Sequence, residues 1–163
     1  MKQPIGNQSE TKSLGFNLDE HLPYLLVRSA NQVGVITQKQ YQNTTPDGLK
    51  LSLREFRTLV IVAVRNVVSP AAVADATGMD RSTVTRALAT LRGKGLIKET
   101  PNENDKRAKF LQLTDEGRAL SDQILPRMKA YDHLMEAEFS QKEISQFSSM
   151  LDRLVHLFAQ GPK

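Results

Sequence analysis

Hydroxyl and guanidinium side chains crowd one short stretch of the chain, from residue 81 to residue 90. Arginine suits guanine edges and phosphate oxygens, and serine and threonine hydroxyls hydrogen-bond to bases or backbone. At about 100° per residue along a helix, these groups fall on one side, and no carboxylate interrupts them. The pattern favours contact with DNA over an ordinary solvated face. The candidate residues are Arg81, Ser82, Thr83, Thr85 and Arg86.

Two short helices joined by a glycine turn are needed to position this face. Ser69 is a typical N-cap and Pro70 suits the first helical position. Gly78 permits the positive φ of a tight turn, and Asp80 caps the second helix at its positive dipole end. The sequence therefore predicts a helix beginning at Pro70 and a second helix over residues 81–92.

Apolar spacing indicates that these two helices cross closely. Ala74 lies four positions before Gly78, and Val84 lies six positions after it, which is the spacing of a helix-turn-helix. On the second helix one side is apolar and is expected to face the core. It consists of Val84, Ala87, Leu88 and Leu91.

A β-hairpin is predicted directly after the second helix. Residues 96–100 and 108–113 have strand character, and residues 101–105 are typical of a turn. A helix-turn-helix followed by a hairpin is a winged helix. Lys106, Arg107 and Lys109 lie at or beside the wing tip, from which they could reach a minor groove or its phosphates; a solvated hairpin tip is the alternative.

The motifs in this region resemble the MarR family of bacterial winged-helix regulators. They are Gly95-Leu96-Ile97, Asp105-Lys106-Arg107 and Leu113-Thr114-Asp115-Glu116-Gly117, and the order of elements agrees from about residue 17 to 158. The resemblance implies a homodimer that binds a short inverted repeat, usually as a repressor. It also implies that Arg107 enters the minor groove and that Asp105 orients it.

Charge is concentrated where DNA contact is predicted. The net charge is +4, but residues 50–113 carry twelve basic and six acidic side chains. The rest of the chain is neutral or slightly acidic. A positive excess confined to one segment is the electrostatic signature of a phosphate-binding surface.

Several classes of function are excluded by composition. The chain has no cysteine, which rules out disulfides and thiolate metal sites, and its three histidines lack the spacing of a zinc site. No nucleophile elbow or complete phosphate loop is present, so we expect neither an enzyme nor a cofactor. The longest apolar run, residues 59–64, is too short to cross a membrane, and a cytoplasmic protein is expected.

Helices are predicted on both sides of the winged helix. Capping boxes at Ser52 and Ser140 begin two of them, and Thr114 begins a third that passes Pro126, where a bend is expected. Pro23 predicts that the first helix starts irregularly or settles only there. The expected organisation is a disordered tail over residues 1–16 and one domain over residues 17–160. Its DNA-binding core spans about residues 50–114, flanked by helices at about 17–42 and 115–160.

The last helix carries an apolar stripe over four turns. Such a stripe is more often intramolecular core, but here it lies outside a small domain that closes its own core, which favours a dimer core shared by both chain ends. The stripe consists of Ile144, Phe147, Leu151, Leu154, Val155 and Phe158.

A small-molecule site is a further expectation. By resemblance, family members bind anionic aromatic ligands in the crevice between the dimer helices and the winged helix. His21, Tyr24 and Arg28 share a helical spacing and offer a titratable ring, an aromatic wall and an anion partner. The same three residues could instead pack and pair across the dimer, and both possibilities stay open.

The sequence thus predicts a mainly helical winged helix-turn-helix protein with a small β-hairpin wing and terminal dimerisation helices. Its expected function is a homodimeric repressor that binds an inverted repeat in double-stranded DNA and is released by a small effector. The alternative is a winged-helix module that binds other proteins and lacks specific DNA binding.

Overall fold

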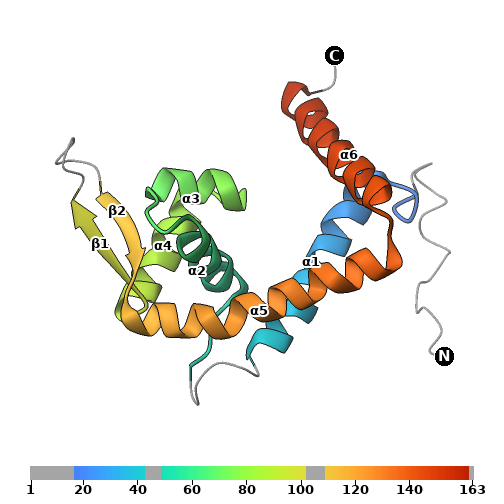
Figure 1. The fold of residues 1–163 in the computed structure, drawn as a ribbon. Coiled ribbons are helices and arrows are strands. Elements are labelled where there is room, and N and C mark those ends of the chain that lie inside the picture. The colour runs from blue at the N-terminus through green and yellow to red at the C-terminus, as the bar shows by residue number, and fades with distance from the viewer. Residues whose placement is uncertain (1–16, 43–48, 102–108, 162–163) are drawn as a thin grey trace.

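The computed structural model describes residues 17–42, 49–101 and 109–161, excluding the side chains of residues 41 and 42. The predicted N-terminal tail lies outside these ranges. The described chain forms six helices and one two-stranded hairpin (Figure 1). They are α1 (Leu22–Gln42), α2 (Leu53–Arg65), α3 (Pro70–Thr77), α4 (Arg81–Gly93), β1 (Ile97–Pro101), β2 (Lys109–Leu113), α5 (Asp115–Glu138) and α6 (Gln141–Gln160).

The helix-turn-helix forms from the predicted caps. The Ser69 hydroxyl accepts the Ala72 N–H at 3.2 Å, and Pro70 is the first residue of α3. Gly78 has φ 66°, the left-handed conformation that the turn into α4 requires. Asp80 has extended backbone, and its carboxylate accepts the Thr83 N–H in the first turn of α4. Local sequence alone therefore sets where both helices begin.

The core of the winged helix lies where α2, α3 and α4 meet the hairpin. Leu59, Leu91 and Leu111 are fully buried and come from α2, α4 and β2. The predicted inner face of α4 is confirmed, since Val84, Ala87, Leu88 and Leu91 are all buried. Ala74 is buried as well, as expected for the close crossing of α3 and α4.

The wing is an antiparallel pair, with Ile97 opposite Leu113 and Pro101 opposite Lys109. Strand β1 begins one residue later than predicted, and Lys109, the first residue of β2, is also the first described residue after residue 101. An isolated bridge joins Val68, just before α3, to Leu111, and so ties the hairpin to the helix-turn-helix. The base of the wing is therefore fixed to the core.

Helix α5 leads from the wing toward α6 (Figure 1). Thr114 caps it, and the Thr114 hydroxyl also donates to the Gly95 carbonyl at 2.5 Å. Gly117 lies against the Leu96 backbone so closely that a Cβ at this position would be 1.9 Å from the Leu96 carbonyl oxygen. Pro126 lies inside α5, and the helix continues past it to Glu138.

Helix α6 lies at the other end of α5, and α1 crosses α5 on that side of the molecule (Figure 1). Helix α1 begins at Leu22, with Pro23 in its first turn, so the earlier residues do not extend the helix. Complete capping boxes at Ser52 and Ser140 begin α2 and α6, as predicted. None of the described helices is both long and apolar enough to span a bilayer.

Candidate nucleic-acid interface

The outer face of α4 presents the predicted hydroxyl and guanidinium groups to solvent. Arg81, Ser82, Thr85 and Arg86 are exposed, and Thr83 is half-buried. All five lie on one 13-residue helix that is packed against the core on its opposite side. The helix is thus held rigidly while its polar face stays free.

Asp80 organises the first turn of this face. Its carboxylate accepts hydrogen bonds from the Thr83 N–H at 2.8 Å, the Ser82 hydroxyl at 2.5 Å and the Thr83 hydroxyl at 2.7 Å. The Ser82 hydroxyl and then the Thr83 groups hold the pKa of the Asp80 carboxyl far below its usual range. Asp80 is therefore ionised at neutral pH and acts only as an acceptor. The sequence predicted that Asp80 caps α4, but not that its carboxylate also accepts hydrogen bonds from the Ser82 and Thr83 hydroxyls.

The other two hydroxyls on this face bond to the helix backbone. The Thr85 hydroxyl donates to the Arg81 carbonyl at 2.8 Å, and the Thr90 hydroxyl donates to the Arg86 carbonyl at 3.1 Å. Arg86 reaches along the helix and donates from Nη2 to the Thr83 hydroxyl oxygen at 3.3 Å.

Arg54 of α2 is a further basic residue of this surface that the sequence analysis did not select. It lines a shallow hollow of about 120 Å³ together with Thr83, Arg86 and Thr90. The hollow brings a third guanidinium beside α4, from a position 27 residues before Arg81 in the chain. The only available signal was the concentration of basic residues between residues 50 and 113.

On the wing, the described candidate is Lys109. Its ammonium donates to Glu99 at 2.7 Å, and Glu99 also pairs with Arg92 at the end of α4. The hydrogen bond from Lys109 and the charge of Arg92 outweigh desolvation and lower the pKa of Glu99. Glu99 thus links the wing to α4 through Arg92, and Lys109 pairs with Glu99 across the hairpin. The predicted wing residues Asp105, Lys106 and Arg107 lie outside the described residues.

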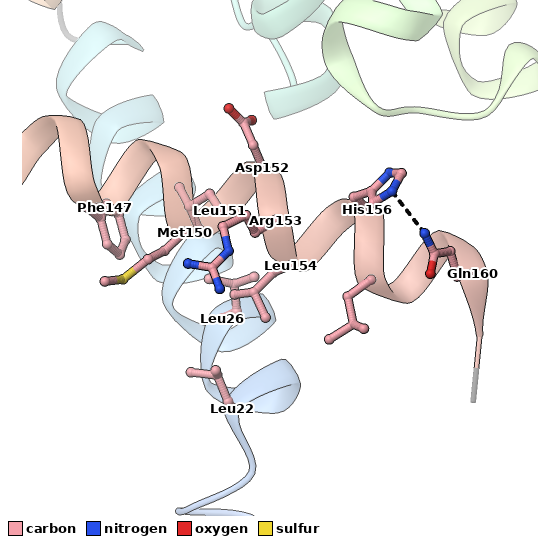
Figure 2. Close-up of a pocket in the computed structure, with 11 residues that line it drawn as sticks. Leu22, Leu26, Phe147, Met150, Leu151, Asp152, Arg153, Leu154, His156 and Gln160 are labelled. Carbon is pink, nitrogen blue, oxygen red and sulfur yellow. Dashed lines mark hydrogen bonds between the residues drawn. The ribbon is translucent and has the colours of Figure 1, made fainter. Parts of the chain in front are cut away.

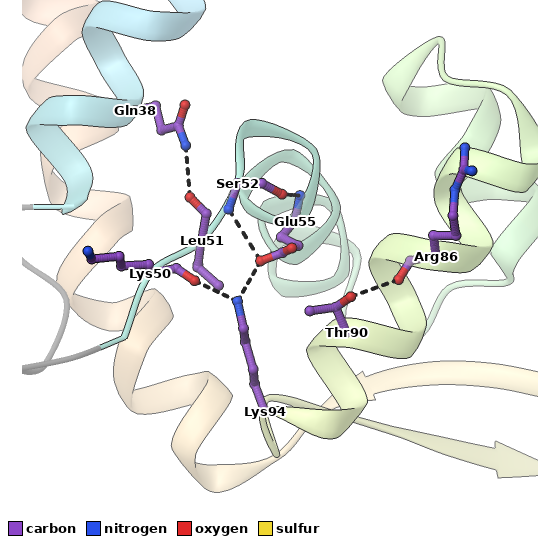
Figure 3. A network of polar contacts seen from close by, with 8 residues as sticks. All are labelled: Gln38, Lys50, Leu51, Ser52, Glu55, Arg86, Thr90 and Lys94. Carbon is purple, nitrogen blue, oxygen red and sulfur yellow. Dashed lines mark hydrogen bonds and ion pairs between the residues drawn. The ribbon is translucent and has the colours of Figure 1, made fainter.

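A polar network fixes the end of α4 to the start of α2 (Figure 3). The Lys94 ammonium lies 2.6 Å from the Glu55 carboxylate and 2.5 Å from the Lys50 carbonyl oxygen. Glu55 in turn accepts the Ser52 N–H in the capping box. One residue along, the Leu51 carbonyl accepts from Gln38 Nε2 of α1 at 2.8 Å. The network links α1, α2 and α4.

The three predicted effector-binding residues lie at the start of α1. The Arg28 guanidinium is 5.8 Å from the centre of the Tyr24 ring and 3.4 Å from the Asp19 carboxylate. His21 immediately precedes the helix and is half-buried. Arg28 therefore contacts Tyr24 and Asp19 within this chain.

A crevice of about 610 Å³ lies between α1 and the winged helix. Among the described residues its lining does not include His21, Tyr24 or Arg28. It is lined by Asn31, Gln38, Ser52, Leu53, Arg54, Arg57, Met79, Asp80 and Thr83. Two guanidiniums, two amides and the Asp80 carboxylate line this crevice next to α4, and the guanidiniums supply its positive charge.

An apolar groove of about 850 Å³ lies between α1 and α6 (Figure 2). Leu22 and Leu26 line one wall, and Phe147, Leu151 and Leu154 are among the residues of the other. Helix α6 is described in full, and none of its residues is buried. The described residues cover the apolar stripe predicted for α6 only in part: Ile144, Leu151 and Leu154 are half-buried, and Phe147, Val155 and Phe158 are exposed.

Comparison with known proteins agrees with this architecture. The family model described as MarR family matches residues 48–108. The transcriptional regulator PecS of Dickeya dadantii is 27% identical over 81% of this chain and 81% of its own length. The chain is thus similar over most of its length to a regulator of the helix-turn-helix type.

Two solved structures are similar in fold. Streptococcus pneumoniae FabT, solved in complex with DNA, has a TM-score of 0.66 and 23% identity, over 87% of this chain and 98% of FabT. Bordetella bronchiseptica BpsR, whose DNA binding is regulated by 6-hydroxynicotinic acid, has a TM-score of 0.63 and 26% identity, over 83% of this chain and 99% of BpsR.

These findings confirm the resemblance noted in the sequence and the prediction that the chain is not an enzyme. They agree with the wing that follows α4 and with the free polar face of that helix. The chain is therefore a MarR-type winged helix-turn-helix transcriptional regulator, and it is a DNA-binding protein.

Proposed function

We propose that the protein is a homodimeric repressor that binds an inverted repeat in double-stranded DNA and is released by a small effector. The observation that carries the proposal is the combination of an exposed hydroxyl and guanidinium face on α4 with end helices whose apolar residues the described part of the chain leaves largely exposed. The first feature supplies DNA contacts, and the second supplies a two-fold partner.

The end helices support dimerisation by their exposed apolar area. Val155 is 70% exposed, Phe147 and Phe158 are each 57% exposed, and Val33 of α1 is 59% exposed. Burying such side chains stabilises by about 1.5–3 kcal/mol each, so a second copy packed on them gains a large association energy. Contiguous apolar surface of this kind is rare on monomers.

A two-fold dimer presents two copies of α4 to the same side of a duplex. Each α4 enters a major groove, and the wing contacts the adjacent minor groove through Lys106 and Arg107, as predicted from the sequence. Because the protein symmetry is two-fold, the two half-sites must form an inverted repeat, with centres about one DNA turn apart. Occupancy of such an operator blocks transcription, which makes the protein a repressor.

Selection from a random duplex library by the purified protein at near-physiological salt tests this proposal. We expect enrichment of an inverted repeat with half-sites about one turn apart. The slope of log affinity against log salt should be about −0.9 for each phosphate neutralised. If no motif emerges and the salt slope is flat, the protein is instead a winged-helix module that binds other proteins.

The effector is proposed to be a small anionic aromatic compound. BpsR responds to 6-hydroxynicotinic acid, which makes aromatic carboxylates, starting with that compound, the first probes to test. Two locations are open to such an anion: the predicted group of His21, Tyr24 and Arg28, and the crevice that contains Arg57.

Single substitutions separate these two locations. In the predicted site, Arg28→Ala should abolish effector-induced release of DNA while leaving DNA affinity intact, and Arg57→Ala should have no effect on release. The reverse result would place the effector in the crevice. Equal loss of DNA binding and release in Arg28→Ala would overturn its role as an effector residue.

A further inference from the structure

Every hydroxyl hydrogen on the outer face of α4 already has an acceptor within the protein. A serine or threonine hydroxyl has one hydrogen to donate and two lone pairs. Ser82 and Thr83 donate to Asp80, and Thr85 and Thr90 donate to backbone carbonyls. An ionised carboxylate and a carbonyl can only accept, so the direction of these four hydrogen bonds is fixed.

Because their hydrogens are already bonded within the protein, these hydroxyls can only accept hydrogen bonds from DNA. Phosphate oxygens are acceptors, so a hydroxyl whose hydrogen is held elsewhere cannot hydrogen-bond to them. In the major groove the base donors are the N6 amino group of adenine and the N4 amino group of cytosine. Guanine offers only acceptors there. The hydroxyls of α4 are thus suited to exocyclic amino groups.

Of the two hydroxyl oxygens whose hydrogens are bonded to Asp80, that of Ser82 has more free lone pairs than that of Thr83. It is exposed, and it lies in the first turn of α4, the part of a recognition helix that reaches base edges. The Thr83 oxygen accepts from Arg86 Nη2 and is half-buried, which leaves it one lone pair. Ser82 is therefore the principal reader.

We propose that Asp80 sets the base preference of α4 by holding the hydroxyl hydrogens of Ser82 and Thr83, so that both side chains read the amino group of adenine or cytosine. Asp80 is a positioning residue, and Ser82 is the specificity-determining one. The inference rests on the proposed function, because it requires that α4 enters a major groove.

The Asp80 carboxylate resists the alternative in which the hydroxyls rotate toward phosphate on binding. Hydrogen bonds to an ionised acceptor are stronger than neutral ones. The backbone N–H of Thr83 anchors the same carboxylate at 2.8 Å, so the acceptor cannot follow a rotating hydroxyl. The phosphate contacts of this surface then come from guanidiniums, those of Arg81 and Arg54 among them.

The test uses the operator selected by the full-length protein and removes one amino group at a time. Purine replaces adenine and 2-pyrimidinone replaces cytosine, since each lacks only the exocyclic amino group. We expect one adenine or cytosine in each half-site whose amino group contributes about five- to tenfold in affinity. In Ser82→Ala this contribution should disappear, while the salt slope stays that of the unsubstituted protein.

Asp80→Asn tests the positioning role without removing the helix cap, because asparagine caps helices as well as aspartate does. Asparagine that keeps the cap places its one acceptor oxygen where Oδ1 lies, so it still accepts from the Thr83 N–H and the Ser82 hydroxyl. The amide nitrogen that replaces Oδ2 cannot accept, so the Thr83 hydroxyl regains a hydrogen to donate. We expect the base preference to weaken at the position that Thr83 reads and to persist at the position that Ser82 reads. Asp75→Asn, on an exposed residue of α3, makes the same charge change and should keep the preference.

Three results would overturn the inference. Ser82→Ala could weaken binding to all duplexes equally, which would make Ser82 a phosphate contact. Asp80→Asn could raise the affinity for all duplexes as much as Asp75→Asn does and leave the base preference unchanged. Asp80 would then affect DNA binding only through its charge. If the unsubstituted protein selects no motif, both the proposed function and this inference fail. If it selects a motif but its affinity does not change when any exocyclic amino group is removed, only this inference fails.

Discussion

Replacing Lys94 with methionine should destabilise the protein by about 2 kcal/mol. The Lys94 ammonium donates to the Glu55 carboxylate at 2.6 Å and to the Lys50 carbonyl oxygen at 2.5 Å. The Lys94 side chain is only 26% exposed, and the Glu55 side chain only 15%. Exposed ion pairs contribute about 0–1 kcal/mol, but hydrogen bonds to charged groups in partly buried places contribute about 1.5–3 kcal/mol. Methionine keeps the apolar stem and removes only the donor.

Urea unfolding at pH 7 and a fixed protein concentration measures this loss, because the stability of a dimer depends on concentration. Lys98→Met is the matched control, since Lys98 is exposed on β1 and its change should stay within about 0.5 kcal/mol. A double-mutant cycle with Glu55→Gln should give a coupling energy of about 1 kcal/mol or more. Equal losses in Lys94→Met and Lys98→Met would refute the reasoning.

The pH dependence of the same pair provides a second check. Burial raises the pKa of Glu55, but hydrogen bonds from Lys94 and Ser52 outweigh it and leave the pKa lowered. A carboxyl with a lowered folded-state pKa contributes stability above its unfolded pKa and loses it as the pH falls. The stability difference between the unsubstituted protein and Glu55→Gln should therefore be full at pH 7 and shrink below about pH 4.

Three further predictions address the backbone, the DNA face and the dimer. Gly117→Ala should cost more than about 3 kcal/mol in thermal unfolding, because its Cβ would collide with the Leu96 carbonyl, whereas Gly93→Ala, with open space around it, should not destabilise. Arg86→Ala should lose about 1–3 kcal/mol of operator affinity and relax the base preference, and uniform weakening would mark a phosphate contact. Val155→Asp should give monomers in analytical ultracentrifugation; since Val155 is 70% exposed in one chain, an unchanged dimer would show that it lies outside the interface.

Helix boundaries followed from the sequence because they are decided locally. Ser52, Ser69, Thr114 and Ser140 each cap the helix that was predicted to begin after them. The inner face of α4 followed from its helical spacing. A cap and an apolar period involve neighbours within a few residues, so no knowledge of the tertiary structure was required.

Contacts between distant segments could not be predicted in this way. Lys94 and Glu55 are 39 residues apart, and nothing in the local pattern of either indicates the other. Arg54 joins the α4 surface only through the packing of α2 on α4. The Arg28–Asp19 pair was missed for another reason: Pro23 delays the start of α1, so the preceding turn folds back within reach of the helix.

The length of α5 means that a small tilt at one end of the helix produces a large displacement at the other end. Its 24 residues make a rod about 36 Å long, with the hairpin rooted at one end and α6 following the other. A tilt of about 5° at the α6 end would displace the opposite end by about 3 Å, close to the rise of one base pair. In the proposed dimer, the two copies of α5 extend from the dimer interface to the two winged helices. A small change in the angle between them at the interface therefore alters the distance between the two copies of α4. The distance along DNA that the protein can span is thus governed far from the surface that touches it.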